Sequence, residues 1–327
     1  MGVLRVALDK MIAFVFPGQG AQYAGMGKEM AKMYAEARAV FERADAVLET
    51  KLSTLCWEGP DELLRQTENT QPAILATSLA CLAVLDARGI RPHVAAGLSL
   101  GEYTALVCAQ AMQLNDALPL VRRRGQFMQA AAGRRRTAMA AVLGLDPEAV
   151  AKVCAQASRK GVVEPANFNS PGQIVIAGDE AAVQEGIVLA KAAGARRAVL
   201  LPVSAPFHTS LMRPAADRLA PLLEKVTLSD AAIPVVSNVT AQPVNSPAEI
   251  RRLLIAQVAS PVRWDDSVRT MMHMGVQTFV EIGPGSTLSG LIRKTAPGAR
   301  VMRVEDRATL DQTLAQLLAE AGSHGPT

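Results

Sequence analysis

The chain has 327 residues, of which 50% are hydrophobic and 20% are charged, so it has ample apolar material for a large buried core and not the composition of a disordered protein. The formal net charge of +4 favours acidic partners only mildly, and no run of lysine and arginine is interleaved with aromatic residues, which argues against nucleic-acid binding. The 4 cysteines are widely scattered and form no Cys-x-x-Cys pair, which excludes a disulfide framework and a structural zinc site.

The N-terminal segment does not have the pattern of a signal peptide, because residues 1–10 carry alternating charges and no apolar core. We therefore expect a cytoplasmic protein. The longest uncharged apolar stretch, residues 72–85, is too short to cross a bilayer and is better explained as a buried helix. No contact with a membrane is expected.

The first third of the chain alternates short apolar strands with helices. Pro17 and Gly18 end the first apolar run, and Gly89 ends an apolar helix that we expect to start at Pro72. Strands that alternate with helices imply a parallel sheet covered by helices, in which functional sites gather at the carboxyl ends of the strands. The expected elements are a strand over 11–16, a helix over 28–48, an apolar helix over 71–87, a strand over 93–98 and a helix over 101–112.

The pattern changes near residues 133–136, where the elements become shorter. They follow the order β-α-β-β-α-β, which is typical of a ferredoxin-like fold, so we interpret residues 133–204 as a smaller inserted subdomain. We assign residues 11–132 and 205–321 to the larger α/β part, with 1–10 and 322–327 as terminal extensions, the latter frayed. The expected elements are strands over 138–143, 162–168, 173–177 and 198–203 with helices over 147–157 and 180–193, then a helix after residue 208, strands over 235–238 and 278–282, a helix over 247–258, and a last strand and helix.

Gly97, Ser99 and Gly101 form a G-x-S-x-G pattern. The flanking glycines permit a strained strand-to-helix turn that presents the serine oxygen above a sheet. An expected strand precedes Ser99 and an expected helix follows it, and the helix N-terminus would favour a developing oxyanion. The sequence therefore predicts Ser99 as a nucleophile; the alternative is a tight turn in which the serine caps the helix.

A serine hydroxyl is a weak nucleophile and needs a base within hydrogen-bond reach. Of the 4 histidines, His324 lies in the C-terminal tail, His273 lies in a methionine-rich helix, and His93 precedes its strand. His208 lies where a strand ends and a helix begins, so we expect it at the same sheet edge as Ser99. The helix N-terminus would keep its imidazole neutral; a surface or helix-capping histidine is the alternative.

Arg124 lies on the apolar face of its helix, where an unpaired charge is unfavourable. The residues that share this face are Ala117, Leu120, Val121 and Met128. Arg124 therefore needs an anionic partner, which is either an internal carboxylate or the carboxylate of a substrate, since the guanidinium fork suits both.

Gln257 shares a helical face with Ile250, Leu253 and Leu254, which places an amide among apolar residues. Its carbonyl oxygen could hold the free ring nitrogen of a histidine, and an exposed helical glutamine is the alternative. A glycine-rich loop over residues 17–22 fails both nucleotide-binding templates, yet it can still aim backbone amides at an oxyanion or be a turn without function.

Taken together, five motifs in matching order resemble the malonyl-CoA:acyl-carrier-protein transacylases from about residue 11 to residue 318. This combination is far more specific than any one motif. One departure is Leu98, where many members of the family carry histidine; it puts only a contact beside the serine in doubt, because the G-x-S-x-G turn is retained. The motifs are FPGQGAQ over 16–22, GLSLGEY over 97–103, RGQFM over 124–128, NFNSPGQ over 167–173 and EIGPG over 281–285.

The resemblance implies an α/β-hydrolase-like large subdomain with a parallel sheet and an inserted ferredoxin-like small subdomain. It also implies that Ser99 is acylated, that His208 is its base, and that Gln257 orients this histidine through its side-chain oxygen.

The same resemblance assigns four residues to substrate recognition. The backbone amides of Gln19 and Leu100 would form the oxyanion hole, and Arg124 would bind the free carboxylate of the malonyl group. Phe207 would fill the pocket beside the substrate α-carbon, which disfavours methylmalonyl.

The implied reaction is a ping-pong transfer of malonyl from malonyl-CoA to a serine and then to the phosphopantetheine thiol of acyl carrier protein, for fatty-acid or polyketide synthesis. No metal or other cofactor is expected, and a monomer is expected. Basic clusters at 122–123, 134–136 and 196–197 could steer an acidic carrier or be ordinary solvated surface. The alternative functions are a serine hydrolase or thioesterase on the same scaffold and a non-catalytic carrier-docking module; the retained site residues argue against the latter.

Overall fold

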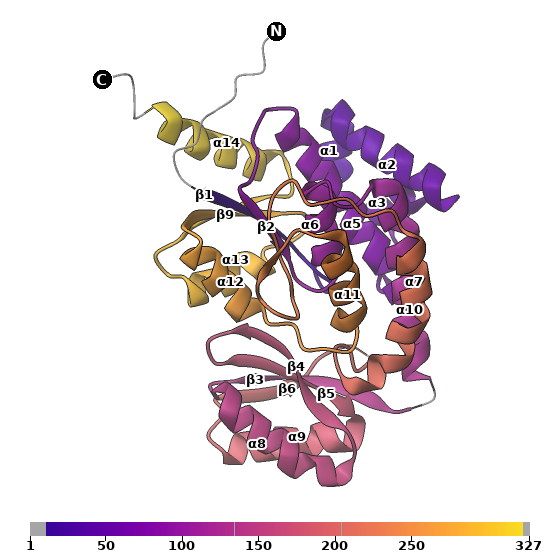
Figure 1. The fold of residues 1–327 in the computed structure, drawn as a ribbon, viewed down its shortest axis with the longest axis vertical. Coiled ribbons are helices and arrows are strands. Elements are labelled where there is room, and N and C mark those ends of the chain that lie inside the picture. Colours follow the sequence, from indigo (N-terminus) through magenta and orange to yellow (C-terminus); the bar gives the residue numbers. More distant parts are fainter. Residues whose placement is uncertain (1–10, 134, 204, 323–327) are drawn as a thin grey trace.

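A six-stranded sheet forms the centre of the larger part of the molecule in this computed structural model, which describes residues 11–133, 135–203 and 205–322 (Figure 1). The spatial order is β10-β9-β1-β2-β7-β8, and all neighbouring pairs are parallel except β7 with β8. The expected parallel sheet is therefore present. Its strands are β1 Met11–Phe16, β2 Val94–Gly97, β7 Val235–Val236, β8 Pro243–Val244, β9 Val276–Ile282 and β10 Arg300–Val304.

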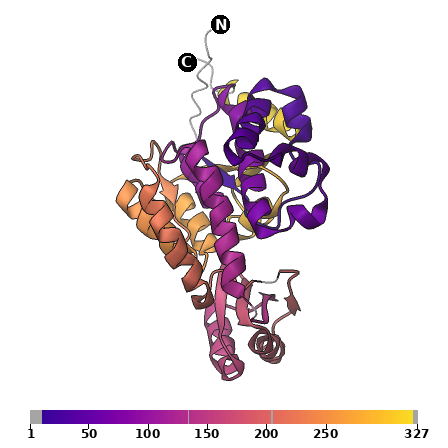
Figure 2. The ribbon, with the colours of Figure 1, turned by 90° about the vertical axis from the view of Figure 1, so that its right-hand side faces the viewer.

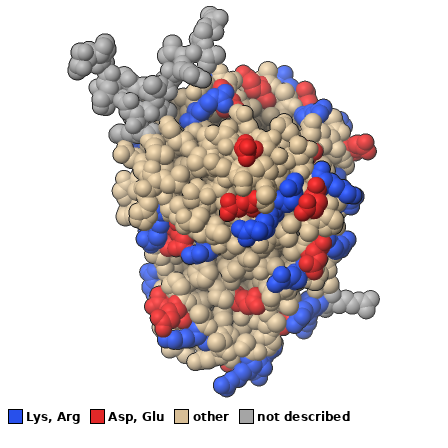
Figure 3. Space-filling model, viewed as in Figure 1, with Lys and Arg blue, Asp and Glu red and all other residues tan. Residues whose placement is uncertain are grey.

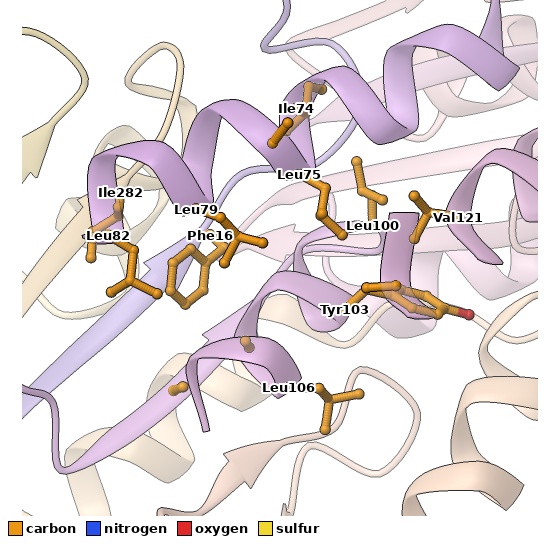
Figure 4. Close-up of a cluster of buried hydrophobic side chains, with 14 of the residues drawn as sticks. Phe16, Ile74, Leu75, Leu79, Leu82, Leu100, Tyr103, Leu106, Val121 and Ile282 are labelled. Carbon is orange, nitrogen blue, oxygen red and sulfur yellow. The ribbon is translucent and has the colours of Figure 1, made fainter. Parts of the chain in front are cut away.

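Alternate residues of β1 point to opposite faces of this sheet, and each face has its own core. Phe14 and Phe16 pack beneath α5, whose residues are almost all buried, and Figure 4 shows Phe16 among leucines of this helix. Ala13 and Val15 pack on the other side against α12 and α13. The helices of this part are α1 Lys28–Met33, α2 Ala35–Leu48, α3 Leu52–Glu58, α4 Asp61–Leu64, α5 Thr67–Asp86, α6 Gly101–Cys108, α7 Leu114–Ala132, α10 Arg213–Lys225, α11 Pro247–Gln257, α12 Trp264–His273, α13 Thr287–Thr295 and α14 Arg307–Gly322.

A second, antiparallel sheet lies at one end of the long axis of the molecule (Figures 1 and 2). Its order is β4-β5-β3-β6, and helices α8 and α9 pack on one face around a separate apolar core. Met139 and Val175 lie on the opposite face, which is turned toward Phe207. The elements are β3 Thr137–Leu143, α8 Pro147–Ala157, β4 Val163–Ser170, β5 Gln173–Asp179, α9 Glu180–Ala192 and β6 Arg197–Leu200.

Three predicted helix boundaries are wrong. The helix expected over 28–48 is broken at Tyr34, which takes an extended conformation with φ −121° and packs its ring against the core. The apolar helix begins at Thr67 and not at residue 71, because its polar first turn carries no apolar pattern. The helix expected to reach residue 112 ends at Cys108, since the chain turns at Gln110 with φ 59°.

Three shorter elements also differ from the prediction. The short helices α3 and α4 were not predicted, and the strand expected to reach residue 203 ends at Leu200. Most of the expected frayed C-terminus, residues 323–327, lies outside the described residues. None of the helices in the described ranges has the length and hydrophobicity needed to span a bilayer.

Candidate active site

Ser99 lies on the turn that joins β2 to α6, in a left-handed backbone conformation with φ 53°. Such a strained turn lifts the serine side chain above the carboxyl edge of the sheet. A Cβ at Gly97 would lie 1.9 Å from the carbonyl carbon of Gly101, and a Cβ at Gly101 would lie 2.1 Å from the carbonyl oxygen of Phe16. The two glycines of the pattern are therefore required by close backbone packing.

His208 comes to the same edge of the sheet from a distant part of the chain. Its Nε2 lies 2.7 Å from the Oγ of Ser99, across 109 residues of sequence. The ring is buried, and the backbone has φ 62°. At this distance the imidazole can accept the proton of the serine hydroxyl directly.

The other ring nitrogen of His208 is held by the main chain of Gln257. Nδ1 lies 2.9 Å from the carbonyl oxygen of Gln257, so the expectation that the side-chain oxygen orients the histidine is wrong in this structure. Gln257 is the last residue of α11, and the last carbonyl groups of a helix have no hydrogen-bond donor within the helix, so they are free to accept from other groups. Because a carbonyl only accepts, Nδ1 carries the proton, which leaves Nε2 free to accept one.

Burial, with a smaller contribution from the Arg124 guanidinium, lowers the pKa of His208 to about 4, while the main-chain carbonyls of Gln257 and Ser260 oppose the shift. The sequence predicted a neutral imidazole from a helix N-terminus. The helix α10 begins only at Arg213, so burial and a nearby cation are the causes. The neutral form is the one that can act as a base.

Arg124 is buried on α7 with its guanidinium against the serine. Nη2 donates to the Oγ of Ser99 at 3.1 Å and to Oε1 of Gln257 at 2.9 Å. Nη1 donates to Oε1 of Gln71 at 2.9 Å, and the guanidinium lies 5.4 Å from the centre of the Tyr103 ring. Burial lowers the pKa of Arg124, but a guanidinium stays charged in proteins. A positive charge with neutral partners therefore faces the reactive oxygen.

A polar network holds the turn from behind. Asn238 follows β7 and accepts from the Ser99 amide at 2.6 Å, while its Nδ2 donates to the carbonyl of Gly97 at 2.7 Å. The buried Gln257 side chain donates from Nε2 to the carbonyl of Ser99 at 2.9 Å and to Oε2 of Glu102 at 2.7 Å. The conformation of the turn is therefore fixed by the side chains of Asn238 and Gln257, which come from two distant segments.

Gln19 and Leu100, whose backbone amides are the expected oxyanion hole, both line the cavity that Ser99 also lines. In the described part of the chain neither amide donates to an acceptor. Leu100 precedes the first residue of α6, where the helix N-terminus adds positive potential. Free backbone amides close to a nucleophile can stabilise the negative oxygen of a tetrahedral intermediate.

The site opens into a cavity of about 1420 Å³ that is shared by the two sheets. Its lining includes Ser99, His208 and Arg124 from the larger part and Met139 and Val175 from the antiparallel sheet. Phe207 and Leu98 also line it, next to the histidine and the serine respectively. Among the described residues no group of three or more His, Cys, Asp or Glu side chains is arranged to hold a metal ion.

Sequence reasoning missed Gln71, Glu102 and Asn238. Gln71 is the last of five polar residues at the start of α5, Glu102 lies in the first turn of the mostly apolar α6, and Asn238 follows β7. The pattern that identified Arg124, a single charged residue on an apolar helix face, was available for Glu102 alone. The roles of all three residues depend on partners far away in the sequence, which the chain alone does not specify.

A serine on a strained strand-to-helix turn, a histidine at 2.7 Å and two free amides constitute the type of site found in α/β enzymes that form a covalent acyl-serine. Comparisons with known proteins agree with this class. A family model described as acyl transferase domain matches residues 13–315.

The curated relatives and solved structures are more specific. The chain is 46% identical to a malonyl CoA-acyl carrier protein transacylase of Bacillus subtilis over 94% of this chain and 98% of that protein, and 47% identical to one of Escherichia coli over 86% and 92%. An acyl carrier protein S-malonyltransferase from Vibrio cholerae has a TM-score of 0.91 at 46% identity, covering 93% of this chain and 100% of that one. The chain therefore belongs to the malonyl CoA-acyl carrier protein transacylase family of acyltransferases.

Proposed function

We propose that this protein transfers the malonyl group of malonyl-CoA to the phosphopantetheine thiol of an acyl carrier protein through a malonyl ester on Ser99. The observation that carries the proposal is the Arg124 guanidinium, 3.1 Å from the Ser99 hydroxyl and surrounded by neutral partners. A planar cation in this position suits the free carboxylate of a malonyl group bound for attack. A solved neighbour is a malonyl-transacylase in complex with its type II PKS acyl-carrier protein, at TM-score 0.91 and 41% identity.

The first half-reaction acylates the serine. His208 takes the proton from the Ser99 hydroxyl at Nε2 as the oxygen attacks the thioester carbonyl carbon. The amides of Gln19 and Leu100 stabilise the oxyanion, the carbon–sulfur bond breaks, and the CoA thiolate receives the proton from His208. The products are a malonyl ester of Ser99 and free CoA.

The second half-reaction runs the same steps in reverse with a different thiol. The phosphopantetheine thiol gives its proton to His208 and attacks the ester carbonyl carbon, and the Ser99 oxygen recovers the proton as it leaves. No metal or redox group takes part in the proposed steps. Nδ1 of His208 donates to a neutral carbonyl and not to a carboxylate, so the imidazolium is less stabilised than in a hydrolase triad. This weaker activation supports transfer to a thiol over transfer to water.

The proposal is tested by weighing the intact protein after incubation with malonyl-CoA. We expect the mass to increase by one malonyl group and the adduct to persist in buffer. Addition of carrier protein that bears phosphopantetheine should return the enzyme to its original mass and malonylate the carrier, whereas carrier without the thiol arm should leave the adduct in place. Absence of an adduct, or its loss to water as fast as to the carrier, would contradict transferase activity and favour a docking module or a hydrolase respectively.

The pH dependence of acylation should reflect the lowered pKa of His208, about 4. The base is competent when neutral, so its contribution is present above the pKa and is lost as the pH falls through it. With acetyl-CoA, an uncharged acyl donor, kcat/KM is expected to stay level from about pH 8 to about pH 5 and to fall below that. The measurement is CoA release against pH, with circular dichroism at each pH to follow folding. If the rate is half-maximal at a pH near the ordinary pKa of histidine, burial does not lower the pKa of His208.

The carrier protein is expected to be acidic, and the basic clusters are partly available to it. Arg135 and Arg136 form ion pairs with Asp179 and Glu180, so their charges are already partly compensated. Figure 3 shows positive and negative side chains interspersed over the visible face, with no single large basic field. Among the clusters, 122–123 and 196–197 therefore fit a steering role better than 135–136.

We also propose an α/β-hydrolase-like large subdomain over 11–132 and 205–321 and a ferredoxin-like insert over 133–204. The parallel sheet with Ser99 after β2 supports the first assignment. The chain order β3-α8-β4-β5-α9-β6 in an antiparallel sheet with both helices on one face supports the second. Phe207, on the cavity wall beside His208, supports selection against a methyl branch on the substrate α-carbon.

A further inference from the structure

Arg124 is a buried cation whose direct hydrogen-bond partners are all uncharged. They are the side-chain oxygens of Gln71, Gln257 and Ser99, and Nε has no partner among the described residues. A buried charge requires compensation by an opposite charge, because desolvation of an isolated ion is highly unfavourable. In the free enzyme that compensation has to come from a carboxylate that does not touch the guanidinium.

Glu102 is the carboxylate that meets this requirement. It lies on the first turn of α6, is 2% exposed, and accepts from Nε2 of Gln257 at 2.7 Å and from the Asn238 amide at 3.1 Å. Its charge and that of Arg124 interact, since each shifts the pKa of the other toward the ionised form. Glu102 is absent from the lining of the cavity, so it does not touch the substrate.

Gln257 joins the two charges with a defined polarity. Its Oε1 accepts from Nη2 of Arg124 at 2.9 Å, while its Nε2 faces Glu102. If the amide were flipped, its NH₂ would face the guanidinium and its oxygen would face the carboxylate. Two donors would then meet at one end and two acceptors at the other, and both contacts would be repulsive. The carboxylate, together with the Ser99 carbonyl that also accepts from Nε2, therefore favours the amide orientation that gives Arg124 an acceptor.

We propose that Glu102 is a positioning residue for malonyl recognition, which supplies the buried counter-charge of Arg124 through the Gln257 amide and holds the guanidinium where the substrate carboxylate binds. This inference rests on the proposed transfer of malonyl groups. An amide link of this kind leaves Nη2 facing the Ser99 oxygen, whereas a direct carboxylate–guanidinium pair would occupy the fork that the substrate needs.

The same network holds the Ser99 turn, but the Gln257 and Asn238 side chains bind that turn directly and the Glu102 side chain does not, so loss of the Glu102 charge should affect the charged substrate most. His208 is held by the main-chain carbonyl of Gln257, whose position does not depend on which way the side-chain amide faces. The free amide of Gln19 belongs to another segment, and that of Leu100 lies in the turn before α6, which is fixed by the close backbone packing at Gly97 and Gly101. Loss of the Glu102 charge should therefore weaken the use of malonyl-CoA while the use of acetyl-CoA is retained.

The test is Glu102→Gln, which keeps the size of the side chain and removes its charge. We expect kcat/KM for malonyl-CoA to fall by about tenfold or more, as for the loss of a hydrogen bond to a charged group, and kcat/KM for acetyl-CoA to change by less than about twofold. The matched control is Glu281→Gln, a fully buried carboxylate that accepts from the amides of Leu288 and Ser289 at 3.0 and 2.8 Å. It should lower the melting temperature and leave the malonyl-to-acetyl ratio unchanged.

A measurement on the wild-type protein covers the case in which Glu102→Gln does not fold. Burial raises the pKa of Glu102 to about 7, against the opposing effects of the Gln257, Asn238 and Ser237 donors and of Arg124. The titratable neighbour on its own helix, Tyr103, has its pKa raised to about 12 and stays neutral. The malonyl-to-acetyl ratio of kcat/KM should therefore be highest above about pH 7 and fall as the pH drops through it.

The outcomes separate this inference from the proposed function. If the wild-type protein forms no malonyl adduct, both fail together. If it forms the adduct and Glu102→Gln lowers malonyl and acetyl transfer equally, or raises malonyl transfer, the positioning role is overturned and the function stands. A malonyl-to-acetyl ratio of kcat/KM that stays constant in the wild-type protein from about pH 6 to about pH 8 would also overturn the positioning role of Glu102.

Discussion

Ser99→Ala is expected to abolish the malonyl adduct and to lower transfer to the carrier thiol by a factor on the order of 10⁴ to 10⁶, the range found when a serine nucleophile is removed. The reason is geometric, since the Ser99 oxygen is the atom that His208 contacts at 2.7 Å and Arg124 at 3.1 Å. Intact-protein mass spectrometry after incubation with malonyl-CoA measures the first effect, and a carrier-malonylation assay measures the second.

The control for this variant is Ser158→Ala, an exposed serine at the end of α8 whose hydroxyl donates only to the Ala155 carbonyl. It should acylate as the wild-type protein does. An adduct that persists in Ser99→Ala would place the ester on another residue and would contradict the assignment of Ser99. The alanine removes only the hydroxyl and fits the φ of 53° no worse than serine, so the fold should survive.

Ser99 could be located from sequence because its position follows from topology. The carboxyl ends of parallel strands lie at one edge, so the serine after β2 was expected there. His208 was expected at the same edge for a wrong reason, since the strand before it, β6, lies in the antiparallel sheet and α10 begins only at Arg213. The G-x-S-x-G pattern is also constrained locally, by the contacts that a Cβ at Gly97 or Gly101 would make. Such features depend on backbone packing, which a short pattern encodes.

The supporting network could not be located in this way. Asn238 binds the Ser99 amide across 139 residues, and Gln257 reaches Glu102 across 155. Each is a single polar residue whose partner is specified only by the tertiary structure. Gln257 illustrates the limit, since burial of its amide was predicted from its helical face, yet its main-chain oxygen contacts His208 and its side chain joins Arg124 to Glu102.

Arg124→Ala is expected to lower kcat/KM for malonyl-CoA by about 10² to 10³, the effect of truncating one partner of a buried charged hydrogen-bonded pair. The variant removes the only cation that contacts Ser99 among the described residues, and it leaves the buried Oε1 atoms of Gln71 and Gln257 without that donor. The space left by the side chain is bordered by neutral polar atoms, so kcat/KM for acetyl-CoA should rise relative to kcat/KM for malonyl-CoA. The measurement is the ratio of kcat/KM for the two donors.

Arg123→Ala is the matched control, because Arg123 is the preceding residue of α7 and is exposed, with Nη1 bound to Gln126. It should leave the ratio unchanged. If Glu102 acts through Arg124, adding Glu102→Gln to Arg124→Ala should change the ratio no further, since two substitutions in one pathway of interaction are not additive. An unchanged malonyl preference in Arg124→Ala would show that the guanidinium does not bind the substrate carboxylate. A further drop in the double variant would show instead that Glu102 reaches the substrate by another route.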